Sequence, residues 1–342
     1  MRKFFSLFII VVLVTVFIGC SSSGANSRIT FTPPQIPCEK FVEEYHTQGR
    51  SYKTYVDDDV KYDYLCDFFK WSNRNYNSRQ FSSEGVPLVK YYGKDEMNPC
   101  TILQYTLAVY GRYLKGESSK EDFLKVADYC IGMMSEDGSF RYNFGYRYYV
   151  APGKYYKTGW TSSMPNGHML QVMARAYSLT KDPKYIKAGN SALDFLNVPI
   201  EAGGVKTTLK DISPDLESYV MYEEYPCTPA TYTLNGYMFT LIGIYDWSCL
   251  DGTGKKKEAE KMFKDGIETL KVILPAYDLG GITCYDLSYL TWKREKPHVA
   301  SRYHAIHVAF CKIFFDITGD EEFNFYFKKW KDYVEKDNDK TL

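Results

Sequence analysis

The sequence has no excess of charge of either sign. Its 342 residues include 42 lysines and arginines and 42 aspartates and glutamates, so the formal net charge is zero. Proteins that bind the nucleic-acid backbone carry a basic patch or stripe. The basic run at residues 255–257 lies in a predicted loop, where we expect it to be solvated. The composition therefore argues against a nucleic-acid partner.

Motifs of the common catalytic and metal sites are also missing. The chain has no Walker loop, no His-Glu-x-x-His pair and no Gly-x-Ser-x-Gly turn. His304 and His307 have a spacing that suits a metal pair, but no cluster of carboxylates accompanies them. We therefore expect a protein that needs no metal and no cofactor.

Closely spaced cysteine pairs are absent from the nine cysteines. A chain of this size does not need a disulfide scaffold. Cys130 continues an apolar stripe with Phe123 and Ala127, which predicts a buried free thiol. The sequence leaves the disulfide state open.

Long apolar runs are missing except at the N-terminus. Arg2 and Lys3 precede the apolar residues 4–17, and Gly19-Cys20 closes the run. This is the layout of a secretory signal peptide, and it is shorter than the ~20 apolar residues of a membrane-spanning helix. Its end resembles the bacterial lipobox, which implies cleavage after residue 19 and lipidation of Cys20. We expect an exported bacterial lipoprotein, anchored to a membrane and facing the periplasm or the cell surface; the alternative is an uncleaved signal anchor.

Helical periodicity dominates the rest of the chain. Apolar residues recur at i, i+3, i+4 and i+7 in four stretches, within residues 103–114, 170–177, 234–241 and 303–314. Asn98-Pro99, Asp182-Pro183 and Thr228-Pro229 each place a capping side chain before a proline, which predicts three helix starts.

Glycine-centred stretches recur between the predicted helix pairs, at Gly138, Gly203-Gly204 and Gly280-Gly281. A unit of two helices and a turn cannot bury its apolar face alone, so neighbouring units must pack together. We predict an all-α fold, an α/α toroid of helical hairpins with Gly-rich β-hairpin turns at one end. An open α-solenoid is the alternative. The predicted segments are a signal peptide (1–19), a lipidated tether (20–40), an N-terminal cap (41–84) and a catalytic domain (85–342).

Aromatic residues are abundant, with 32 tyrosines and 21 phenylalanines. Aromatic rings stack on the faces of sugars, and tyrosine adds a hydroxyl group. The composition suits a carbohydrate-binding protein, and it equally suits a well-packed core.

Several ordered segments carry a specific resemblance. They are Glu223-Glu224-Tyr225-Pro226, Leu234-Asn235-Gly236, Leu241-Ile242-Gly243-Ile244-Tyr245-Asp246, Tyr285-Asp286-Leu287 and Tyr303-His304. In this order they resemble the C-terminal catalytic domain of the D-glucuronyl C5-epimerases, which convert glucuronate to iduronate in heparan-type chains. The resemblance spans roughly residues 85–335 and implies an α/α barrel with its cleft at one end.

The resemblance also implies site residues. The catalytic positions of the family fall on Tyr110, Glu224, Tyr285 and Tyr303, and the sugar-contacting positions fall on Tyr225 and Asn235. The partner that it implies is an acidic, uronate-containing polysaccharide of the glycosaminoglycan type. The sequence leaves the oligomeric state open.

The chain departs from the family pattern at two functional positions. Ser288 stands where the family has an arginine that helps to hold the acidic substrate. The N-terminal catalytic tyrosine of the family has no clear match, although Tyr55, Tyr62 and Tyr64 lie in the right region.

Epimerisation at C5 removes a proton beside a carboxylate and returns one from the opposite face. It needs two acid–base groups and donors that neutralise the enolate. Glu224 and Tyr303 are the expected facing pair, with Tyr285 beside them. A polysaccharide lyase shares the first step, and a non-catalytic glycan-binding lipoprotein is a third interpretation. Tyr110 and Tyr303 each lie on an apolar helical face, where a core role is the alternative.

Overall fold

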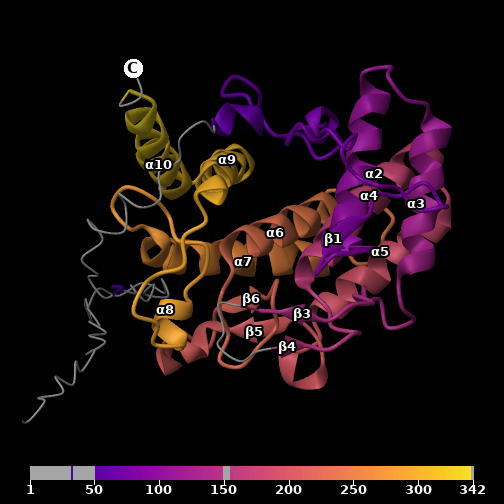
Figure 1. Cartoon of the computed structure of the whole chain (residues 1–342). Helices are drawn as coiled ribbons and strands as arrows, with labels where there is room; N and C mark the ends of the chain where they lie inside the picture. Colours follow the sequence, from indigo (N-terminus) through magenta and orange to yellow (C-terminus); the bar gives the residue numbers. More distant parts are fainter. Residues whose placement is uncertain (1–31, 34–50, 149–154, 340–342) are drawn as a thin grey trace, which may run out of the picture.

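The computed structural model describes residues 32–33, 51–148 and 155–339 (Figure 1). These residues are mostly helical, which confirms the all-α class. The predicted signal peptide, Cys20 and nearly all of the predicted tether lie outside the described residues. No helix within the described ranges is long and apolar enough to cross a membrane.

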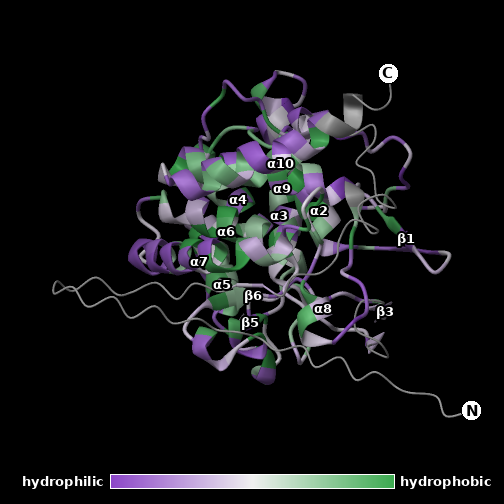
Figure 2. Cartoon of the chain, turned by 90° about the vertical axis from the view of Figure 1, so that its left-hand side faces the viewer, coloured by the Kyte–Doolittle hydropathy of each residue, from purple (hydrophilic) through white to green (hydrophobic). Residues whose placement is uncertain are grey.

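Four helical hairpins make up most of the part of the chain that the structure describes. Each consists of two consecutive helices: α2 (Pro99–Leu114) with α3 (Lys120–Met133), α4 (Ser163–Thr180) with α5 (Pro183–Leu196), α6 (Leu234–Ser248) with α7 (Lys256–Tyr277), and α9 (Ser301–Thr318) with α10 (Glu321–Asp339). The first helices of the hairpins pack in the order α2, α4, α6 and α9. Helices α4 and α6 are buried along nearly their whole length, whereas α7 keeps a hydrophilic outer side (Figure 2).

The N-terminal segment joins the two ends of this row. Its short helix η1 (Tyr52–Thr54) packs against α9, and η2 (Trp71–Asn73) packs against α2. Figure 1 shows this segment crossing above the inner helices. Its side chains Val56, Phe69 and Trp71 belong to the main hydrophobic core. The structure therefore establishes an arc of helical hairpins, and it does not establish the closed toroid that the sequence predicts.

Among the described residues, short strands form three antiparallel pairs: β1 (Val89–Tyr91) with β2 (Lys94–Glu96), β3 (Tyr146–Arg147) with β4 (Tyr155–Tyr156), and β5 (Lys206–Thr208) with β6 (Val220–Tyr222). Three short helices flank β5, namely η3 (Ile200–Ala202), η4 (Leu209–Asp211) and η5 (Pro214–Leu216), and α8 (Ser288–Thr291) follows α7. Strands β3 to β6 gather at one side of the helices (Figure 1). The turn before β5 needs glycine, because Gly203 has a φ of 83°.

Two of the three predicted helix starts are confirmed. The Asn98 side chain accepts a hydrogen bond from Thr101 N at the start of α2, and Asp182 accepts one from Lys184 N at the start of α5. The start predicted at Thr228-Pro229 is wrong, because α6 begins at Leu234. Tyr232 has a φ of 57°, in the left-handed region, so a right-handed helix cannot run through it.

Candidate active site

A cavity of ≈ 560 Å³ opens between the N-terminal segment, the strands and the first turns of α6 and α9. Four of the six predicted site residues line it: Glu224, Tyr225, Asn235 and Tyr303. Aromatic, basic and amide side chains complete the wall, among them Tyr55, Arg74, Arg79, Gln104, Tyr91, Tyr142, Tyr146, Trp160 and Arg302. These residues come from distant parts of the chain, which the fold brings together.

The position of Glu224 follows from the elements on either side of it. It lies two residues after β6, and its side chain lies against the first turn of α6. A side chain at Gly236 would collide with the Glu224 carboxylate, so the glycine leaves room for it. The Asn235 Nδ2 group donates to Glu224 Oε2 at 3.4 Å.

Glu224 lies in surroundings that favour its neutral form. Its side chain is 9% exposed, and burial raises its pKa to about 7. Hydrogen bonds from Tyr225, Tyr285 and Asn235 oppose this rise because they stabilise the carboxylate. A group with a pKa near 7 is poised to take up and release a proton at neutral pH.

Tyr303 lies next to Tyr285, and Tyr285 lies next to Glu224. The ring centroids of the two tyrosines are 4.8 Å apart. Tyr303 lies in the first turn of α9 and lines the cavity, while the buried Tyr285 donates to the two Glu224 oxygens at 3.4 and 3.5 Å. Burial raises the pKa of Tyr285 well above its usual value, so its hydroxyl stays protonated and acts as a donor.

Tyr225 and Asn235 present polar groups to the cavity from an ordered wall. The Tyr225 ring stacks on Tyr148 with centroids 4.5 Å apart, which fixes its orientation. Asn235 is 1% exposed, and its Oδ1 atom has no hydrogen-bond partner in the described part of the chain. This acceptor is covered, so a small rotation of the amide group is needed to turn it toward a ligand hydroxyl group in the cavity.

Tyr110 lies apart from the other predicted site residues. Its hydroxyl donates to the Leu65 carbonyl at 2.7 Å, and its ring packs against Phe123 and under the Arg175 guanidinium. It does not line the cavity. In this structure Tyr110 holds α2 against the N-terminal segment, which is the core role that its apolar helical face allows.

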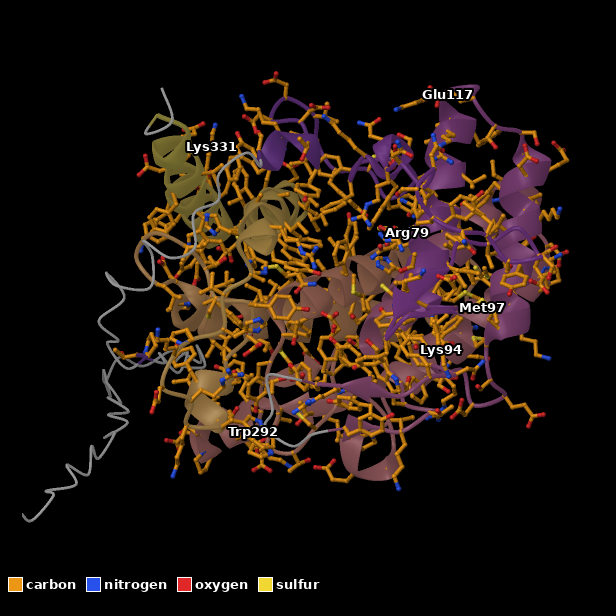
Figure 3. The ribbon with its side chains drawn as sticks, in the orientation of Figure 1. Arg79, Lys94, Met97, Glu117, Trp292 and Lys331 are labelled. Atoms are coloured by element: carbon orange, nitrogen blue, oxygen red, sulfur yellow. The ribbon has the colours of Figure 1, made fainter. Side chains whose placement is uncertain are left out.

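Three arginines around the cavity were not predicted from the sequence. Arg74 donates to Gln104 Oε1 at 2.7 Å and lies over the Trp71 ring, whereas Arg79 and Arg302 are exposed. Figure 3 labels Arg79 in the region between the N-terminal segment and the inner helices. Within the described ranges, none of the three pairs with a carboxylate, although Glu224 lies in the same cavity.

These arginines supply positive charge to the cavity of a chain in which Ser288 replaces the arginine expected for the family. The Ser288 side chain is buried, and its backbone N–H donates to Asp286 Oδ1 at 2.9 Å, so this position brings no positive charge. The N-terminal segment and α9 supply that charge to the cavity instead. Arg302 directly precedes Tyr303, the first residue of the last motif, and this adjacency was the available sequence signal.

The structure separates the three tyrosines named as N-terminal candidates. Tyr55 lines the cavity, with its ring 5.2 Å from that of Phe69. Tyr62 instead donates a hydrogen bond to the buried Asp246, which also binds Arg175 at 2.8 Å. Tyr64 does not line the cavity. Tyr55 is therefore the candidate that is placed to meet a substrate.

Comparison with known proteins identifies the relatives of this site. A family profile described as the D-glucuronyl C5-epimerase C-terminus matches residues 134–332, which is more than half of the chain. The chain belongs to this family. The family match covers β6 with Glu224, the start of α6 and the start of α9, so three walls of the cavity fall within the C5-epimerase C-terminal region.

Two further proteins are similar to this chain in sequence. The D-glucuronyl C5-epimerase of Caenorhabditis elegans is 34% identical over 185 residues, which are 52% of this chain and 29% of the worm protein. An uncharacterised protein of Methanocaldococcus jannaschii is 25% identical over 283 residues, 75% of this chain and 86% of the archaeal protein. The region matched thus covers less than a third of the worm enzyme, whereas the match with the archaeal protein covers most of both chains.

Proposed function

We propose that this protein is a polysaccharide uronate C5-epimerase that converts D-glucuronate to L-iduronate in an acidic polysaccharide. The observation that carries the proposal is Glu224, a buried carboxyl group with a pKa near 7 in a cavity lined by three arginines, none of which forms an ion pair with a carboxylate of the described residues. Membership in the C5-epimerase family supports an isomerase, and the arginines favour an anionic sugar.

In the proposed reaction, the Glu224 carboxylate takes the proton from C5. The C5–H bond breaks, and its electron pair moves into the neighbouring carboxyl group of the substrate. Tyr303 then delivers its hydroxyl proton to C5 from the opposite face, which leaves a tyrosinate. Proton exchange with solvent returns Glu224 to the carboxylate and Tyr303 to the phenol.

The other residues at the cavity assist this exchange. Tyr285 and Asn235 hold the Glu224 carboxylate through hydrogen bonds. Arg74, Arg79 and Arg302 bind the substrate carboxyl group and stabilise the charge that develops on it. The residue chemistry named here requires no metal ion and no cofactor.

We also propose that the protein works outside the cytoplasm, anchored through a lipid on Cys20. The positive residues 2–3, the apolar residues 4–17 and the terminal Gly-Cys support this. In this proposal Cys20→Ser releases the protein from the membrane fraction and removes the added lipid mass. Retention of both would contradict the anchor.

Proton NMR of the protein with heparosan and other uronate polymers in deuterated water tests the activity. We expect iduronate signals and deuterium at C5. Olefinic signals instead would identify a lyase, which eliminates the group at C4 after the same proton removal. Binding of a polymer without exchange at C5 would overturn the proposal and leave a glycan-binding protein.

A further inference from the structure

A second cavity, of ≈ 380 Å³, lies on the other side of the wall that carries the catalytic residues. Trp160 lines both cavities, and its neighbours divide between them. Ser162 and Tyr225 line the catalytic cavity, whereas Thr161 and Pro226 line the second one. Two short chain segments therefore separate the cavities.

Thr161 is the unusual residue of the second cavity. It is 5% exposed, and its Oγ1 atom makes no hydrogen bond within the described ranges. Burying a hydroxyl group without a partner costs about 1–3 kcal/mol. The Oγ1 atom is itself covered, but Thr161 lines the cavity, so rotation of its side chain about the Cα–Cβ bond can turn the hydroxyl toward a ligand that supplies the missing partner. A hydroxyl-bearing ligand suits this position because it can both donate and accept.

Arg141 offers hydrogen-bond donors to the second cavity, while its positive charge is offset by a neighbouring aspartate. Its Nη2 atom contacts Asp137 Oδ2 at 2.6 Å, and Nη1 lies 3.4 Å from the Gly159 carbonyl. The aspartate offsets the positive charge, and further guanidinium N–H groups remain to donate. In the catalytic cavity, by contrast, the arginines form no ion pair with any carboxylate that the structure describes. The second cavity thus favours an uncharged polar ligand over an anion.

The remaining walls suit a ring with an apolar face. Trp160 and Pro226 contribute apolar surface, and the turn at Gly203 and Gly204 contributes backbone without side chains. Nothing lies within 4 Å of the position that a side chain at Gly203 would occupy, so the turn leaves open space. Sugar rings combine an apolar face of C–H groups with hydroxyl groups at the edge.

We infer that the second cavity is a saccharide-binding site that takes an uncharged sugar unit of the same polysaccharide whose uronate occupies the catalytic cavity. The identity of the chain rests on the proposed function, whereas the preference for an uncharged sugar rests on Thr161 and the Arg141–Asp137 pair. The site would hold the polymer beside the reacting unit and make binding depend on chain length.

Threonine-methyl NMR separates the two cavities in one spectrum. Thr101 lines the catalytic cavity, and Thr161 and Thr228 line the second. Heparosan oligosaccharides from disaccharide to decasaccharide are titrated into the Glu224→Gln protein, which prevents turnover. We expect short oligosaccharides to shift the Thr101 signal, and longer ones to shift the Thr161 and Thr228 signals as well.

Variants then test whether the shifts of the Thr161 and Thr228 signals come from binding in the second cavity. Arg141→Ala and Thr161→Val should each weaken the response of Thr228 to the decasaccharide by about tenfold, since each removes a hydrogen-bonding group. The response of Thr101 to the shortest binding oligosaccharide should not change. Thr161→Val keeps the side-chain shape and removes a hydroxyl without a partner, so we expect no loss of thermal stability. Arg147→Ala is the matched control, because exposed Arg147 lines neither cavity.

Every outcome bears on the inference. A Thr101 response alone, even with the decasaccharide, would overturn the second site and leave the proposed function standing. Responses of Thr161 and Thr228 without Thr101 would support the second site and count against the proposed function. No response at any of the three threonines would overturn both. A Thr228 response that Arg141→Ala and Thr161→Val leave unchanged would also overturn the site.

Discussion

At the scale of single residues, two adjacent glutamates receive different surroundings from the fold. Glu224 lines the candidate active-site cavity, whereas Glu223 is fully buried outside it and accepts a hydrogen bond from Tyr232 N at 2.8 Å. Burial raises the pKa of both groups. Glu224 is the one that can touch a substrate, so its neighbour offers a matched control.

Glu224→Gln should lower kcat at least about a thousandfold, because amide nitrogen cannot take up the C5 proton. Glu223→Gln should keep kcat within about threefold, since this side chain does not reach the cavity. Initial rates of iduronate formation at saturating substrate measure both. Equal losses in the two variants would show that burial of charge, and not proton transfer, explains the effect.

The same substitution should stabilise the fold at alkaline pH. The folded pKa of Glu224 is raised from 4.5 to about 7, so the folded protein binds more protons and loses stability as pH rises between these values. Gln lacks this penalty, which is at most about 3 kcal/mol above pH 7. Thermal melts at pH 5 and pH 8 should show a larger advantage of the variant at pH 8. An advantage that does not change with pH would contradict the raised pKa.

Tyr285→Phe should move the acid side of the pH–rate profile to higher pH. The Tyr285 hydroxyl stabilises the Glu224 carboxylate, so its loss raises the pKa of Glu224 further. The control is Tyr237→Phe, which removes a buried hydroxyl that donates to the Val220 carbonyl. The pH dependence of kcat/KM is the measurement, and an unshifted profile in Tyr285→Phe would rule out this role.

At this scale, the candidate residues could be named where ordered motifs were available. Glu224, Tyr225, Asn235 and Tyr303 were named from such motifs, and they line one cavity. Tyr110 was named from the same resemblance, but its hydroxyl binds the backbone of the N-terminal segment. The apolar stripe on its helix face is the sequence pattern of a core residue.

At the scale of elements, two arginines from segments far apart in the sequence line the same cavity. Arg302 lies in the first turn of α9, an end of a helix that disfavours positive charge. Arg79 lies in the loop after η2 and faces the same cavity. Their positions depend on long-range packing, so no local pattern could have revealed that they meet.

Arg302→Ala should raise KM about tenfold with a smaller effect on kcat, because a charge-assisted contact to the substrate carboxyl group is lost. Arg302→Lys should recover part of the affinity. The control is Arg147→Ala, an exposed arginine outside the cavity. Steady-state kinetics at low and high salt measure the effect, and an unchanged KM would remove Arg302 from the substrate site.

Helices α4 and α6 pack closely because glycines meet at their contact. A side chain at Gly243 would collide with the Gly167 carbonyl. Gly243→Ala should therefore lower the free energy of unfolding by about 1–3 kcal/mol or more. Gly132→Ala in α3 is the control, since nothing lies within 4 Å of the new methyl group there. It should stabilise by about 0.5–1 kcal/mol. Denaturant titrations compare the two, and equal effects would contradict the close contact.

At the scale of the whole molecule, the helical class could be predicted because four stretches have strong helical periodicity. The way in which the N-terminal segment joins α2 and α9, the two ends of the row of hairpins, could not be predicted. That connection depends on contacts between distant residues, such as the buried Arg175–Asp246 pair that also binds the hydroxyl of Tyr62 and the carbonyl of Cys66. Residues 51–84 are rich in Tyr and Asp and lack a clear period, so their place across α9 and α2 had no local signal.

The central claim is that Glu224 and Tyr303 act on opposite faces of C5, and hydrogen–deuterium exchange at C5 tests it most directly. Heparosan is incubated in deuterated water with the wild type, Tyr303→Phe or Glu224→Gln. We expect deuterium in both uronates with the wild type, deuterium in glucuronate without iduronate with Tyr303→Phe, and neither with Glu224→Gln. Exchange by Glu224→Gln at the wild-type rate would contradict the account.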